Sequence, residues 1–303
     1  MATLIQQIVN GLVLGALIGL IALGYTMVYG ISQLINFAHG EVFMVGAFGA
    51  HFTARYLLPE GVGWYVGLPA MCAAAVAVSV AVAAAMERLA YRPLRGAHKL
   101  APLITALGVS ILLQEFVRVF YPGATAPLAF PRAFADGHLA VGPVMVLWTG
   151  VLALVVAPLL AAVLHVYVER SLLGRAMRAT ALDPDTARLM GINLDRVILA
   201  TFVIGAVLAG VGAVLYGIHY TQIDTAIGFQ NGIFAFTAAV LGGIGNIRGA
   251  MLGALCIGLV KSLAGQYAWG GAQYDYVWVF VLLILVLMFR PQGFLGRPEG
   301  VRA

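Results

Sequence analysis

Charged side chains are scarce in this sequence. They make up 10% of the 303 residues, whereas hydrophobic residues make up 62% and the mean hydropathy is +0.98. Soluble domains carry about 25% charged residues, so the composition excludes an ordinary soluble protein. The apolar stretches approach the ~20 residues that a helix needs to cross a membrane. The sequence therefore predicts an all-α polytopic membrane protein with a single transmembrane domain over residues 1–303.

Residues that would support catalysis or covalent cross-links are also lacking. The two cysteines, Cys72 and Cys256, lie in apolar segments, so we interpret them as small core residues rather than a disulfide framework. Lys261-Ser262 resembles the end of a phosphate loop, but the glycines that the loop needs are replaced by Val260 and Leu255. No HExxH or Gly-x-Ser-x-Gly pattern occurs, and the histidines lack metal-ligand spacing. We expect no enzyme, no metal site, no cofactor and no nucleic-acid partner.

The basic residues collect in three loops. Residues 88–99, 169–196 and the C-terminal segment hold four, five and three of them, which is 12 of the 17 Lys and Arg. Such a bias marks the cytoplasmic side, so we expect a cytoplasmic C-terminus. Four other basic residues fall near the outer face, and the side of Arg248 stays open; the four are Arg55, Arg118, Arg132 and Lys261. The pattern gives eight or nine spans and leaves the side of the N-terminus open.

Polar residues interrupt the apolar pattern in two places. Asn36, His39 and Glu41 follow the first span, and Gly243 and Asn246 lie between two late apolar runs. The first interruption is either a cytoplasmic turn or a broken helix, and we favour the broken helix because no Lys or Arg accompanies it. Segments 36–46 and 243–253 echo each other weakly, which suggests an inverted repeat. Interrupted helices in two halves of a transporter mark the substrate pathway.

Several smaller features complete the expected topology. Gly11, Gly15 and Gly19 leave one face of the first span smooth for helix packing. Residues 121–142 are expected to form an outer loop, with a short surface helix as one option, and residues 143–168 a span interrupted at Pro158. Glu115 and Arg118 are interpreted as an interfacial ion pair rather than a proton relay.

The longest polar interval is residues 169–195. Apolar residues recur in it at helical spacing, and Asp183-Pro184 can begin a second short helix, with Asp183 as the N-cap. A pair of short amphipathic helices on the cytoplasmic side suits docking to another protein. A solvated loop that joins two spans is the alternative, and the residues alone do not decide between them.

Five motifs resemble the permease subunits of branched-chain amino acid ABC importers. They are NFAHGEVFMVGAF at 36–48, ERLAYRPLR at 87–95, GRAMRATALDPDTARLMGIN at 174–193, GGIGNIRGAMLGA at 242–254 and RPQGFLG at 290–296. The resemblance covers essentially the whole chain and is closer to the LivH-type subunit than to the LivM type. Permeases of urea or short amides share much of the first motif.

The resemblance implies partners and roles. The partners would be a LivM-type permease, two ATPase subunits that bind the ATP, and a periplasmic substrate-binding protein, in a bacterial inner membrane. The segment at 174–193 matches the loop that seats in the ATPase, and the expected contact residues are Gly174, Arg175, Ala179 and Gly191. The expected substrate pathway holds Asn36, His39, Glu41, Gly243 and Asn246. A urea or amide permease, a proton-coupled carrier and a structural anchor remain the alternatives.

Overall fold

A computed structural model describes residues 2–34, 36–59, 62–98, 100–131, 137–142 and 144–296. Seven helical segments in these residues are long and apolar enough to cross a membrane. They are α1 (Ala2–Ser32), α3 (Trp64–Met86, prolonged by η2, Glu87–Tyr91, and η3, Arg92–Leu94), α4 (Leu100–Phe120), α5 (Trp148–Arg170), α8 (Leu194–Tyr220), α10 (Ile247–Tyr267) and α11 (Asp275–Phe289, preceded by η4, Gly271–Tyr274). Two shorter helices lie among them: α2 (His39–Phe52, continued by η1, Thr53–Leu57) and α9 (Ile227–Gly242). The seven long and two short helices together make nine, which is roughly consistent with the eight or nine spans that the sequence predicted.

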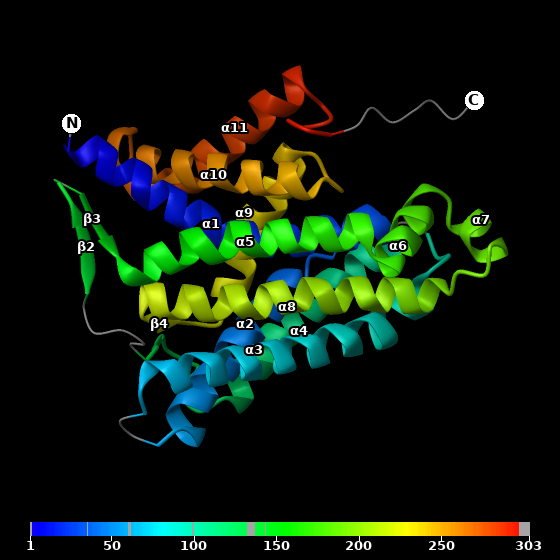
Figure 1. Cartoon of the computed structure of the whole chain (residues 1–303), viewed down its shortest axis with the longest axis horizontal. Helices are drawn as coiled ribbons and strands as arrows, with labels where there is room; N and C mark the ends of the chain where they lie inside the picture. Colours follow the sequence, from blue (N-terminus) through cyan, green and yellow to red (C-terminus); the bar gives the residue numbers. More distant parts are fainter. Residues whose placement is uncertain are drawn as a thin grey trace.

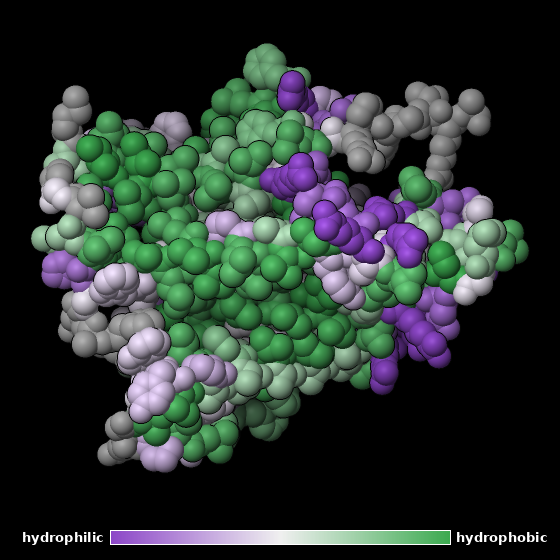
Figure 2. All heavy atoms as spheres, viewed as in Figure 1, coloured by the Kyte–Doolittle hydropathy of each residue, from purple (hydrophilic) through white to green (hydrophobic). Residues whose placement is uncertain are grey.

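The long helices run side by side and give the molecule two ends (Figure 1). The α7 end carries α6 (Leu172–Leu182) and α7 (Pro184–Leu189). The hairpin end carries the antiparallel strands β2 (His138–Val141) and β3 (Val144–Leu147). On the face in view, the most hydrophilic residues gather at the α7 end (Figure 2). Among the basic residues counted above, Lys99, Arg132, Arg297 and Arg302 lie outside the described residues.

Residues 121–142 differ from expectation. The described part of this segment holds strands and no surface helix: β1 (Leu128–Ala129) pairs with β4 (Gln222–Ile223), and β2 pairs with β3. The next span begins at Trp148, later than predicted, because Val144 to Leu147 pair as a strand. Pro143 lies outside the described residues. Helix α5 also continues through Pro158, so the predicted interruption is wrong. Neighbouring helices in a membrane tolerate such a proline.

Glycines bring α1 and α10 into backbone contact. A Cβ on Gly15 would lie 2.7 Å from the Cα of Leu255, and one on Gly258 would lie 2.3 Å from the backbone of Gly11 and Gly15. The predicted smooth face of α1 is therefore confirmed, and α10 is its partner. Close backbone approach through small residues is a main source of helix association in lipid, where the hydrophobic effect between helices is absent.

Helices α1 to α4 and α8 to α11 form an inverted repeat. Gln33 (φ 54°) and Thr221 (φ 55°) directly follow α1 and α8, and they are the non-glycine residues with positive φ in the described chain. Each is followed by a short loop and then a short helix. Helix α1 packs on α9 and α10, as α8 packs on α2 and α3. Since α1 starts at the hairpin end and α8 starts at the α7 end, the two halves run in opposite directions (Figure 1).

The weak sequence echo matched the wrong segments. By element order, the loop before α2 corresponds to the loop before α9, residues 221–226, and not to residues 243–253. The turn at 243–246 instead separates α9 from α10, whose counterpart is the connection between η1 and α3. The match on glycines failed because the two glycine-rich breaks occupy different places in the repeat.

The two short helices touch near their first turns. A Cβ on Gly40 of α2 would lie 2.2 Å from the carbonyl oxygen of Gly228 in α9, and one on Gly228 would lie 2.8 Å from that of Gly40. Asn36 and His39, which begin this region, are each 2% exposed. The segment therefore lies within the protein rather than on a membrane surface, and the broken helix is confirmed.

We predict that Gly258→Leu disrupts packing of α1 on α10. The added side chain meets backbone atoms that have no room to move, and overpacking of this kind costs at least about 1–3 kcal/mol. Monodisperse protein recovered in mild detergent should fall sharply. The matched control is Gly108→Leu, in the exposed part of α4, where a Cβ meets nothing within 4 Å. Equal recovery of both variants would contradict the assigned contact.

Candidate functional site

A polar cluster is buried at the start of α2. The Tyr91 hydroxyl donates to Oδ1 of Asn36 at 2.7 Å, and the Ser110 hydroxyl donates to Oε1 of Glu41 at 3.1 Å. Glu41 is 1% exposed and lies in the first turn of α2, where the helix dipole favours a negative charge. The His39 ring packs edge-on against Tyr25 with centroids 5.0 Å apart. Three of the predicted pathway residues are thus brought together.

Each of these three side chains keeps a polar atom without a partner. Asn36 Nδ2, His39 Nε2 and Glu41 Oε2 are buried and form no hydrogen bond within the described residues. An unsatisfied buried polar group costs about 1–3 kcal/mol. Polar side chains kept at such a cost within a membrane protein mark substrate or ion pathways. The cluster therefore holds hydrogen-bonding atoms that no described residue satisfies.

Helix α4 contacts the starts of both short helices. Ser110 reaches Glu41 of α2, and Gln114, one turn further on, donates from Nε2 to the carbonyl oxygen of Thr225, just before α9, at 3.0 Å. Sequence reasoning gave neither Ser110 nor Tyr91 a role. Polar residues four apart in an apolar span, such as Ser110 and Gln114, were the available signal.

Gly243 and Asn246 lie elsewhere, in the turn between α9 and α10. Gly243 has φ of 99°, which favours glycine. The Asn246 side chain caps α10 by accepting from the backbone N–H of Arg248 and Gly249, at 3.0 and 3.1 Å. Its Nδ2 donates to the carbonyl oxygen of Leu295 at 2.8 Å. These contacts build a turn that the C-terminal segment covers. None of them involves a residue of the Asn36 cluster.

The expected coupling segment folds as two short helices. Asp183 caps α7, accepting from the N–H of Asp185 and Thr186 at 3.0 and 3.2 Å, as the sequence predicted. Gly174 is buried beneath the end of α5, because a Cβ there would lie 2.1 Å from the carbonyl oxygen of Val168. Gly191 has φ of 82° and turns the chain into α8.

The surface of these two helices is more apolar than expected. Leu182, Leu189 and Met190 are 75%, 88% and 79% exposed. Arg175 is exposed, and Ala179 is half-buried. We call Leu182, Leu189 and Met190 the apolar tip. Sequence reasoning did not identify it, although large apolar residues outside the spans were a usable signal.

Ion pairs join the base of this segment to α3. Asp195, in the first turn of α8, pairs with Arg92 and Arg95, and Arg95 also pairs with the buried Glu87. Tyr91 belongs to the same turn as Glu87 and bonds Asn36. A series of contacts therefore connects the start of α8, which follows the apolar tip in the chain, to the Asn36 cluster. It passes through Arg95, Glu87 and Tyr91.

Other charged groups have local partners. Arg118 and Glu115 pair at 3.0 Å with both side chains about half exposed, so the predicted ion pair is confirmed. Arg248 lies at the α7 end, where its guanidinium contacts His165 Nε2 at 2.5 Å. In the described ranges, no group of three or more His, Cys, Asp and Glu side chains is arranged to hold a metal ion.

The family model for the permease component of the branched-chain amino acid transport system matches residues 7–288. The high-affinity branched-chain amino acid transport system permease protein BraD of Pseudomonas aeruginosa is 48% identical, with 97% of this chain and 96% of the relative covered. LivH of Escherichia coli K12 is 43% identical over the same shares. A probable LivM permease of Methanocaldococcus jannaschii is 28% identical over 44% of this chain and 43% of the relative.

A solved structure, PsaBC from Streptococcus pneumoniae in complex with Fab, superposes with a TM-score of 0.52 at 12% identity, covering 93% of this chain and 91% of that one. At this identity the likeness extends to the fold alone. The sequence matches, in contrast, run almost from end to end at well above 30% identity. The chain therefore belongs to the family of permease components of branched-chain amino acid transport systems.

Proposed function

We propose that this chain is the membrane-spanning subunit of an ATP-driven importer that carries leucine, isoleucine and valine across a bacterial inner membrane. Its near full-length similarity to the permeases BraD and LivH carries the proposal. The chain itself is not an enzyme, and ATP hydrolysis belongs to separate ATPase subunits. No cofactor is needed in this subunit, since ATP is bound by its partners.

The α7 end is the cytoplasmic end in this proposal. The positive-inside bias supports that side, and it makes the C-terminus cytoplasmic. Helices α6 and α7 seat in a groove of an ATPase subunit, and the apolar tip supplies the contact that becomes desolvated. Gly174 and Gly191 shape the segment, and Arg175 and Ala179 lie on its surface. A periplasmic substrate-binding protein docks at the hairpin end, and a LivM-type permease completes the membrane pair.

Closure of the ATPases drives alternating access through the contacts described above. Movement of α7 displaces the first turn of α8, which Asp195 ties to Arg92 and Arg95. Tyr91 then carries the displacement to Asn36 and the start of α2. The pathway that opens is mostly apolar with few polar groups, which suits an aliphatic side chain on a zwitterionic head. Gly243 and Asn246 contribute to the cytoplasmic exit.

The deciding experiment is uptake into proteoliposomes that contain the purified assembly and its binding protein. We expect accumulation of labelled leucine that requires ATP and is competed by isoleucine and valine. Uptake of urea or acetamide in place of leucine would favour the amide permease. Uptake driven by a proton gradient without ATP would favour a secondary carrier, with His39, Glu41 or Glu115 as the residues to mutate.

We predict that Leu189→Asp together with Met190→Asp prevents capture of the ATPase subunits. Two charges at a site that must lose its water oppose docking by several kcal/mol. Co-purification in mild detergent should fall at least tenfold, while membrane insertion is unchanged. Leu139→Asp is the control, because Leu139 is 40% exposed at the opposite end. Normal capture by the double variant would remove the apolar tip from the interface.

We predict that Gly191→Val abolishes leucine uptake without loss of membrane insertion. The backbone at Gly191 adopts φ of 82°, which a β-branched residue takes only with strain, although no neighbour lies within 4 Å of its Cβ. The turn between α7 and α8 should therefore shift while the spans remain intact. Uptake and the amount of protein in membranes are measured together. Full uptake by a stably inserted variant would contradict a coupling role for this turn.

We predict that Tyr91→Phe lowers the leucine carried per ATP hydrolysed. The change removes one hydroxyl, and its hydrogen bond contributes about 0.5–1.5 kcal/mol. The free energy of unfolding should fall by about 1–3 kcal/mol, because Asn36 Oδ1 stays buried without a donor. Coupling should fall severalfold with ATPase activity retained. A double-mutant cycle with Asn36→Ala should show that the two effects are not additive. Tyr56→Phe, an exposed tyrosine outside the cluster, serves as the control.

A further inference from the structure

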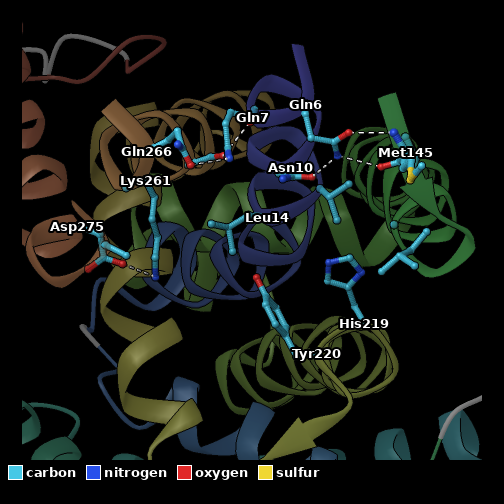
Figure 3. Close-up of a pocket in the computed structure, with 17 residues that line it drawn as sticks. Gln6, Gln7, Asn10, Leu14, Met145, His219, Tyr220, Lys261, Gln266 and Asp275 are labelled. Atoms are coloured by element: carbon cyan, nitrogen blue, oxygen red, sulfur yellow. Dashed lines mark hydrogen bonds and ion pairs between the residues drawn. The ribbon is translucent and has the colours of Figure 1, made fainter. Parts of the chain in front are cut away.

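A cavity of about 540 Å³ lies at the hairpin end (Figure 3). Its walls come from the first half of α1, the ends of α8 and α10, strand β3 and the start of α11. Small-molecule sites in proteins occupy about 300–1,000 Å³, so one amino acid with a few waters fits here. The cavity is separate from the Asn36 cluster and shares no lining residue with it.

One wall of the cavity carries an ion pair. Lys261 Nζ lies 3.1 Å from Asp275 Oδ2, and the two side chains are 24% and 13% exposed. The ammonium also sits over the ring of Phe234, 3.8 Å from its centroid. An ionisable residue within a membrane-spanning helix is costly and usually functional. Because the two charges cancel, the cavity favours neither a net anion nor a net cation.

Several hydrogen-bonding groups around the Lys261–Asp275 pair have donors or acceptors that no described residue uses. The ammonium has more donors than its one bond to Asp275 uses, and the second carboxylate oxygen of Asp275 has no hydrogen-bond partner among the residues that the structure describes. The Tyr220 hydroxyl is likewise without a bond there, and His219 uses only Nδ1, which contacts the Thr149 hydroxyl at 3.0 Å. Figure 3 shows Lys261, Tyr220 and His219 reaching in from α10 and α8.

The remaining wall of the cavity is formed by aliphatic side chains and by side chains that end in amides. Leu14 projects from α1 between Lys261 and Tyr220 (Figure 3), and Val13 and Val146 also line the space. Gln7 is held in place, because the Ser262 hydroxyl bonds its side chain and its carbonyl oxygen at 2.8 and 2.7 Å. A balanced charge pair thus faces apolar side chains across one cavity.

We propose that this cavity binds a free aliphatic α-amino acid as its zwitterion. The carboxylate lies at Lys261, the ammonium at Asp275, and the side chain against Leu14 and Val13. The choice of amino acid rests on the proposed function, whereas the demand for a zwitterion rests on the charge pair alone. Urea and simple amides carry no charges to match it. The site receives the solute at the hairpin end, before it reaches the Asn36 cluster.

The test is equilibrium binding of labelled leucine to the purified membrane assembly in nanodiscs, without binding protein. The variant is Lys261→Met with Asp275→Asn, which removes both charges and leaves neither one buried alone. We expect saturable binding by the wild type and at least tenfold weaker binding by the variant. The control is Glu115→Gln with Arg118→Gln, which removes an exposed pair outside the cavity and should bind as the wild type does.

Three outcomes would overturn the proposal. Equal leucine affinity in variant and wild type would assign Lys261 and Asp275 a structural role only. Loss of leucine binding in phosphatidylethanolamine nanodiscs, but not in phosphatidylglycerol nanodiscs, would assign the cavity to a zwitterionic lipid head group. Binding of leucinamide as tightly as leucine would remove the need for a carboxylate. ATP-driven leucine uptake, measured in parallel, separates failure of this site from failure of the proposed function.

Discussion

The contact between α2 and α9 at Gly40 and Gly228 is the constraint on which the rest of the structure depends. Both helices begin among buried residues, and their first turns meet where a single Cβ on either glycine would strike backbone. The contact joins the two halves of the inverted repeat at equivalent positions. A break in the helical pattern is tolerated at membrane depth only where protein encloses it. The long helices α1, α3, α8 and α10 provide that enclosure.

This arrangement places polar chemistry at the centre of an apolar protein. The loops before α2 and α9 bring Asn36 and Thr225 to positions that side chains from η2 and α4 can reach. Tyr91 connects one of these loops to the ion pairs of Asp195 at the α7 end. Direct contacts therefore join the surface at the α7 end to the loop before α2.

The two ends of the molecule differ in the side chains that they present. The α7 end carries basic residues and the apolar tip, which suit a protein partner. The hairpin end carries a cavity whose charges balance, which suits a small neutral solute. On the face in view, most of the surface between the ends is apolar (Figure 2).

The sequence by itself determined the class of protein, the approximate spans and the local signals. Apolar run length and the Asp183 cap follow from residue type and spacing, because each depends on neighbours within a turn or two. The burial of Asn36, His39 and Glu41 depends instead on distant elements, since Tyr91 and Ser110 bond this segment and Gly228 packs against it. The motifs likewise identified the family.

Only the tertiary structure decided which segments correspond in the repeat. It also showed that Gly243 and Asn246 build a separate turn, whose contacts do not involve the Asn36 cluster. It also paired Lys261 with Asp275 from separate helices. These relations join residues far apart in the chain, and their energies come from packing between helices. No local periodicity encodes such contacts.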